Sequence, residues 1–117
     1  MQHFTAKAER KKKIRLILRN LREELQDIST ALKEHLQRHE LVKVRIAIPS
    51  WDAVQNSDLA LDLIELDSYD ELIRVYSTIE EFNEDRHTES DENLRELLQQ
   101  IVTHAETAAE NIREEAK

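Results

Sequence analysis

Residues 14–32 read IRLILRNLREELQDISTAL, and this stretch decides the fold. Its aliphatic side chains recur at alternating steps of four and three residues, which is the heptad pattern of a helix with one apolar edge. The residues of this edge, called the seam below, are Ile14, Leu18, Leu21, Leu25, Ile28 and Leu32. The pattern predicts a long basic helix over residues 6–45, after a disordered start over residues 1–5.

The chain around the seam contains almost nothing that interrupts a helix. It has 117 residues, no glycine and a single proline, Pro49. Glycine and proline supply the left-handed turns and corners that strands and phosphate-binding loops need. The composition therefore predicts an all-α protein, and it excludes P-loops, dinucleotide-binding loops and nucleophile elbows.

The predicted break in the helical pattern is Ile48-Pro49-Ser50-Trp51-Asp52-Ala53. The residue before a proline is disfavoured in helical geometry, so the first helix should end close to this point. Ser50 is expected to cap a short helix that carries Trp51. We interpret Pro49 and Trp51 as a structural anchor, with the Trp51 ring filling the core where the chain turns. The alternative is an exposed Trp51 that holds a partner.

Two further helices follow the Trp51 segment. Residues 50–85 contain a central helix with apolar side chains at helical spacing, and residues 90–116 contain a C-terminal helix. The apolar patch Leu59–Leu66 fits either a short buried helix or an irregular tether. The whole chain, residues 1–117, is therefore expected to be one domain. Its predicted fold is an antiparallel bundle of three main helices plus a short Trp-bearing helix.

The length of the first helix bears on assembly. A helix over residues 6–45 is about 60 Å long, which exceeds the length of either later helix. Part of the seam should then stay uncovered in a single chain, and an exposed apolar stripe favours association. We therefore expect a homo-oligomer held by the seam.

Charge is divided unevenly along the chain. The net charge is −8, yet residues 1–45 hold 12 basic against 6 acidic residues, a net +6, whereas residues 46–117 hold 5 against 19, a net −14. A basic segment on the first helix consists of Arg10, Lys11, Lys12, Lys13, Arg15, Arg19 and Arg22. It fits a solvated helix face, contact with anionic lipid headgroups or contact with nucleic-acid phosphates.

Of the two binding hypotheses, contact with an anionic membrane surface fits the rest of the chain better. The acidic remainder repels phosphates, and no helix-turn-helix or aromatic stacking platform is evident. No apolar run approaches the ~20 residues of a transmembrane helix, and the N-terminus lacks the apolar core of a signal peptide. We expect a cytoplasmic protein that works at the inner face of the cell membrane.

Residues that could carry chemistry are sparse. The chain has no cysteine, which excludes disulfides and thiolate sites. His35 and His39 share a helix face, and Glu84 with His87 forms one Glu-x-x-His pair, but a di-iron bundle needs that pair twice. The sequence therefore predicts no catalytic residue, no metal, no cofactor and no small-molecule substrate.

Three stretches resemble a helical domain that recurs in uncharacterised bacterial and archaeal proteins. They are Ile48–Val54, which is similar to an (L/I)-P-(S/T)-x-W-(D/E)-A motif, the patch Leu59–Leu66, and Tyr69–Asn83 with its I-E-x-x-N-like end. The resemblance covers about residues 10–85. It implies a cytoplasmic helical segment that often follows N-terminal transmembrane helices, and it brings no established catalytic residues.

The resemblance and the charge pattern together favour one class of function. The chain is expected to be a non-enzymatic oligomeric interaction or scaffold module, and the resemblance implies that it is the cytoplasmic part of a membrane-associated protein of uncharacterised role. The alternative is a nucleic-acid-associated regulatory protein that uses the basic first helix. These classes differ in whether the basic segment meets lipid headgroups or nucleic-acid phosphates.

Overall fold

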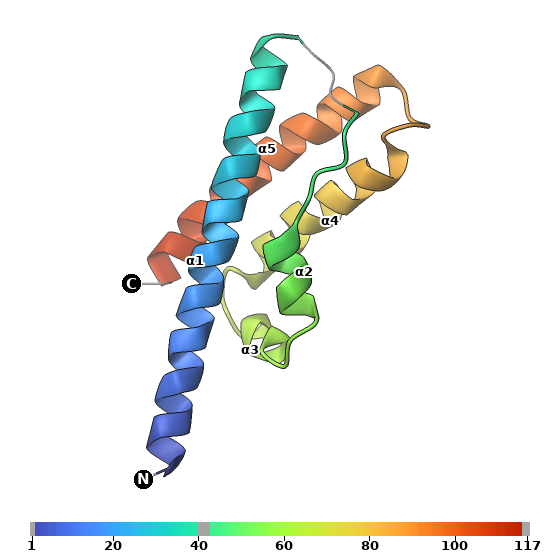
Figure 1. Cartoon of the computed structure of the whole chain (residues 1–117). Helices are drawn as coiled ribbons and strands as arrows, with labels where there is room; N and C mark the ends of the chain where they lie inside the picture. Colours follow the sequence, from blue (N-terminus) through green and yellow to red (C-terminus); the bar gives the residue numbers. More distant parts are fainter. Residues whose placement is uncertain (1, 40–42, 116–117) are drawn as a thin grey trace.

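The computed structural model describes residues 2–39 and 43–115, with side chains from Ala8 onward, and this part of the chain contains five helices and no strand. The protein is all-α, as the composition predicted. The helices in chain order are α1 (Gln2–Gln37), α2 (Pro49–Gln55), α3 (Ala60–Ile64), α4 (Tyr69–Asp85) and α5 (Asp91–Glu115). The long helix α5 runs antiparallel to both α1 and α4 and packs against each of them, while α2 packs against α1 (Figure 1).

The first helix differs from its predicted bounds at both ends. It begins at Gln2, where a disordered start was predicted, and it stops at Gln37 instead of continuing to residue 45. His39 adopts a left-handed backbone conformation with a φ of 57°, which turns the chain out of the helix without a glycine. Met1, residues 40–42 and Ala116, which the predicted ranges included, lie outside the described residues.

The segment between α1 and α2 is held away from helical geometry by a side chain of α4. The backbone N–H of Ile46 donates a hydrogen bond of 2.7 Å to the Asn83 side-chain oxygen. The Asn83 amide nitrogen donates in return to the Ile46 carbonyl oxygen over 2.9 Å. Because this pairing satisfies both backbone groups of Ile46, the segment needs no helical hydrogen bonds at that residue.

The helix after the break also begins differently from the prediction. Pro49 is its first residue and Ser50 lies within it, so Ser50 is not the cap. The preceding residue, Ile48, has no polar side chain to cap the helix. Glu24 of α1 accepts the hydrogen bond from the Ser50 N–H instead, over 2.9 Å.

The patch Leu59–Leu66, which the sequence left open, contains the short helix α3. Leu63 lies in the core, whereas Leu61 and Ile64 are exposed. The next helix, α4, begins after Ser68, whose N–H and hydroxyl both donate to the Glu115 carboxylate over 2.9 and 2.7 Å. The end of α5 therefore caps the start of α4.

The seam of α1 lies inside a single chain. Four of its residues are buried, and Ile14 and Ile28 pack against the same core. The seam from Ile14 to Leu32 is about 27 Å long, and α5, with 25 residues, is about 37 Å long. Contrary to the expectation, the later helices cover most of the seam within one chain, because the seam begins after Arg10, which already contacts α3. That the chain forms an oligomer stays a prediction.

No helix in the described part of the chain combines the length and the apolar content that a membrane crossing requires.

Candidate functional site

Most of the basic segment lies on the N-terminal half of α1, which meets the other helices from Arg10 onward, where Arg10 contacts α3 (Figure 1). Five of its basic side chains are exposed, and within the described residues none of the five forms an ion pair with a carboxylate. They are Lys11, Lys12, Lys13, Arg15 and Arg19. Their charge is therefore not neutralised by the acidic remainder of the chain.

The spacing of the basic residues places several of them along one face of α1. Lys11, Arg15, Arg19 and Arg22 follow one another at steps of four, four and three residues, which aligns side chains along a helix. The same face continues into an open groove between α1 and α5. On the α1 side this groove is lined by Arg22, Gln26, Ser29, Thr30 and Lys33.

Two members of the predicted basic segment have other surroundings. The Arg10 Nε atom lies 2.7 Å from the Asp62 Oδ2 atom, which holds α3 beside α1. Arg22 is half-buried in the groove, and its Nε atom is buried without a hydrogen-bond partner. The structure thus separates these two arginines from the five exposed basic residues.

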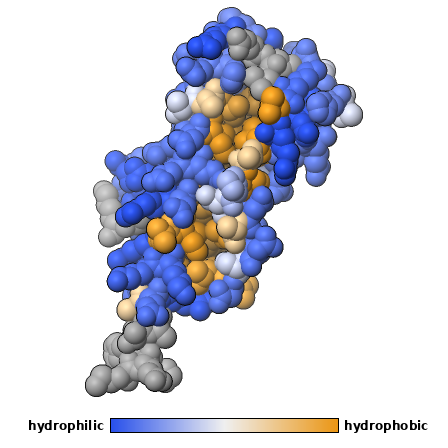
Figure 2. Space-filling view, in the orientation of Figure 1, coloured by the Kyte–Doolittle hydropathy of each residue, from blue (hydrophilic) through white to orange (hydrophobic). Residues whose placement is uncertain are grey.

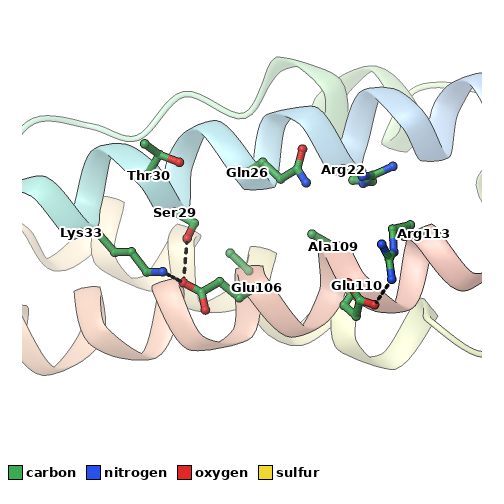
Figure 3. Close-up of a pocket in the computed structure, with 10 residues that line it drawn as sticks. Arg22, Gln26, Ser29, Thr30, Lys33, Glu106, Ala109, Glu110 and Arg113 are labelled. Carbon is green, nitrogen blue, oxygen red and sulfur yellow. Dashed lines mark hydrogen bonds and ion pairs between the residues drawn. The ribbon is translucent and has the colours of Figure 1, made fainter.

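The groove between α1 and α5 has a volume of about 540 Å³ and contains charges of both signs (Figure 3). Lys33 forms an ion pair with Glu106, to which the Ser29 hydroxyl also donates over 3.2 Å. The hydrogen bond from Lys33 lowers the pKa of the Glu106 carboxyl below its ordinary value. Glu110 pairs with Arg113 over 2.8 Å. The charges of these pairs neutralise one another. The Lys33–Glu106 pair connects α1 with α5, and the paired residues present little net charge to a ligand.

A buried polar cluster lies at the break between α1 and α2. Trp51 is 4% exposed and stacks on Tyr76, with ring centroids 4.4 Å apart and planes inclined by 5°. The Tyr76 hydroxyl donates to one Glu24 oxygen over 2.7 Å, while Ser50 donates to the other. Burial, together with the hydrogen bond to the Glu24 carboxylate, raises the pKa of Tyr76 above its ordinary value. The cluster joins α1, α2 and α4, and Trp51 faces the core and not a partner.

The structural roles of Glu24, Asn83 and Glu115 were not predicted from the sequence, although Asn83 ends the I-E-x-x-N-like stretch. Glu24 carried a usable signal, because it lies three residues after Leu21 and next to Leu25, at the edge of the apolar seam. A carboxylate there is buried when the seam is covered, and a buried charge requires hydrogen-bond donors. The roles of Asn83 and Glu115 depend on residues far away in the chain, so their sequence positions carry no comparable signal.

His35 and His39 lie at or just after the C-terminal end of α1, whereas His87 follows the end of α4. His104 lies near Glu71, with 3.8 Å between Nδ1 and Oε2. Among the side chains that the structure describes, over residues 8–39 and 43–115, no three His, Asp or Glu come together as a metal site would require. The exposed basic residues of α1 are therefore the candidate site that we consider further.

Comparisons of the chain with protein-family models, with curated proteins and with solved structures found no match. The resemblance over residues 10–85, and the membrane association that it implies, stay predictions.

Proposed function

We propose that the protein is a non-enzymatic interaction module that binds an anionic membrane surface through the exposed basic side chains on the N-terminal half of α1. The observation that supports this proposal is the set of five exposed basic residues without carboxylate partners, from Lys11 to Arg19. A basic residue near an anionic bilayer contributes about 1 kcal/mol to binding. Several of them on one helix therefore produce binding without a pocket.

The charge of the remaining chain supports a defined orientation. Residues 46–117 carry a net −14, which an anionic surface repels, whereas residues 1–45 carry a net +6. The molecule should therefore approach the surface with the N-terminal end of α1 first. The cytoplasmic leaflet contains anionic lipids, and it is the surface to which we assign this contact.

Nucleic acid is the competing partner, because phosphates attract the same basic side chains. Proteins that bind single strands add aromatic side chains on which bases stack. In this molecule Trp51, Tyr76 and Phe82 are buried in the core. This burial favours the membrane surface over nucleic acid.

Co-sedimentation with lipid vesicles tests the proposal. We expect binding to vesicles that contain phosphatidylserine, weakening as salt rises toward physiological concentration, and no binding to neutral phosphatidylcholine vesicles. Replacing Lys11, Arg15 and Arg19 by Gln should abolish binding while the helix content by circular dichroism stays unchanged, because Gln is a comparable helix former.

A matched variant controls for the change in net charge. Replacing Arg38, Arg45 and Arg74 by Gln removes the same number of positive charges from exposed positions outside the basic segment, and it should leave vesicle binding intact. Equal loss in both variants would contradict a role for this particular surface. Salt-sensitive binding to duplex DNA, without binding to acidic vesicles, would support the nucleic-acid-associated alternative.

A further inference from the structure

The short helix α3 presents two aliphatic side chains to solvent. Leu61 is 74% exposed and Ile64 is 51% exposed. They are neighbours on the helix surface because they lie three residues apart. Exposed acidic residues flank them in the sequence, and we call the whole set the α3 patch: Leu61, Ile64, Asp58, Glu65 and Asp67.

The N-terminal half of α1 has the complementary composition. Leu16 is 54% exposed, and Lys12 and Lys13 lie four and three residues before it on the helix. At this spacing the two lysines adjoin Leu16 on the helix surface. We call these three residues the Leu16 surface. An aliphatic side chain with basic neighbours on α1 thus matches aliphatic side chains with acidic neighbours on α3.

The two surfaces lie at the same end of the molecule. The ion pair between Arg10 and Asp62 holds α3 beside the N-terminal half of α1 (Figure 1). The same pair shows that a basic residue of this part of α1 and an acidic residue of α3 can meet within one chain. On the face seen in Figure 2, apolar side chains reach the surface where α1 meets α2 and α3.

We infer that the occupant of the α3 patch is the Leu16 surface of a second copy of this chain, in a two-fold symmetric dimer. In such a dimer the α3 patch of each copy contacts the Leu16 surface of the other copy, so the same contact occurs twice. Because both surfaces lie at one end of the molecule, a two-fold axis at that end brings both pairs together at once. Lys12 and Lys13 also belong to the basic residues of the proposed function, but Lys11, Arg15 and Arg19 are not required for the dimer contact, so the inference goes beyond the proposed function.

Sedimentation equilibrium from micromolar to millimolar protein concentration tests the dimer. The double variant Leu61→Ser with Ile64→Ser should raise the dissociation constant about tenfold or more, because it removes two aliphatic side chains from the interface. The control is Val44→Ser, at a residue that is 68% exposed in the segment after α1. It should leave the dissociation constant unchanged.

A charge exchange tests which surfaces meet. The variant Lys12→Glu with Lys13→Glu places acid against acid in both halves of its own dimer, and Asp58→Lys with Glu65→Lys places base against base. Each variant alone should be monomeric. An equimolar mixture should form heterodimers, because opposite charges then face each other in both halves.

Three results would overturn the inference. They are a wild-type chain that stays monomeric at every concentration, an association that the α3 variant leaves unchanged, and a charge-exchanged mixture that stays monomeric. A monomer that still binds acidic vesicles would disprove the dimer and leave the proposed function standing. A dimer that does not bind acidic vesicles would support the dimer and contradict the proposed function.

Discussion

Glu24 is an acidic side chain inside the bundle, and two separate parts of the chain depend on it. Its carboxylate accepts one hydrogen bond from the Tyr76 hydroxyl of α4 and another from the Ser50 N–H of α2. A buried donor that loses its acceptor destabilises a protein by about 1–3 kcal/mol. One residue of α1 therefore determines how both α2 and α4 attach to it.

Replacing Glu24 by Leu should lower the free energy of unfolding by about 2–4 kcal/mol, because two buried donors lose their acceptor. Chemical denaturation followed by circular dichroism measures the change. The control is Glu23→Leu at the exposed neighbouring residue, where we expect a change within about 0.5 kcal/mol. Equal stability of the two variants would show that the donors find other acceptors.

Helices α4 and α5 depend on each other through their ends. The first N–H groups of any helix have no partner within the helix, and Ser68 at the start of α4 has no side-chain cap of its own. The Glu115 carboxylate at the end of α5 accepts hydrogen bonds from both the N–H and the hydroxyl of Ser68. In this chain without glycine, carboxylate and amide side chains from distant residues form the hydrogen bonds that local turn residues form in other proteins.

Replacing Glu115 by Ala should destabilise the protein by about 1 kcal/mol, which is a typical effect of losing a helix cap. It should also speed amide hydrogen exchange in the first turn of α4, far from the substitution in the sequence. The matched variant is Glu114→Ala, next to Glu115 but exposed. If both variants exchange alike at the start of α4, the Glu115 contact does not stabilise that turn.

The molecule as a whole is held together by the packing of α1 along α5. The apolar faces of both helices are used inside one chain, and the large apolar side chains that the structure describes as exposed on helices are Leu16 of α1 and Leu61 and Ile64 of α3. The heptad pattern therefore describes an internal interface. Stability and association should respond to different substitutions.

Leu25→Ala should lower the free energy of unfolding by about 2–5 kcal/mol, because it opens a cavity in the core. It should not change the mass of the folded protein in solution. Leu16→Ala should do the opposite, weakening association with little effect on unfolding, since Leu16 is exposed. Light scattering and denaturant melts of both variants check this. If Leu25→Ala weakened association without lowering the free energy of unfolding, the seam would be an interface between copies and not an internal one.

Periodicity and composition were sufficient to predict the helical class, the apolar edge of α1 and the basic character of its first part. These properties follow from the spacing of neighbouring residues, since a helix repeats every 3.6 residues wherever it lies. The exposure of Lys11, Lys12 and Lys13 could also be predicted from their spacing relative to the apolar edge of the helix. Residue spacing does not say what will cover a given face, however, and the seam that was expected to stay uncovered is largely covered within one chain.

Long-range packing settled the rest. Helix α5 packs over the seam, and α1 ends at Gln37. Arg10 forms an ion pair with Asp62 and is therefore not one of the unpaired basic residues. Glu24 is buried, and it accepts a hydrogen bond from Tyr76. The two residues of the Arg10–Asp62 pair, like those of the Glu24–Tyr76 pair, are 52 positions apart in the chain. Burial and hydrogen-bond partners depend on which helices meet, and that depends on the free energy of the whole core and not on any local stretch of residues.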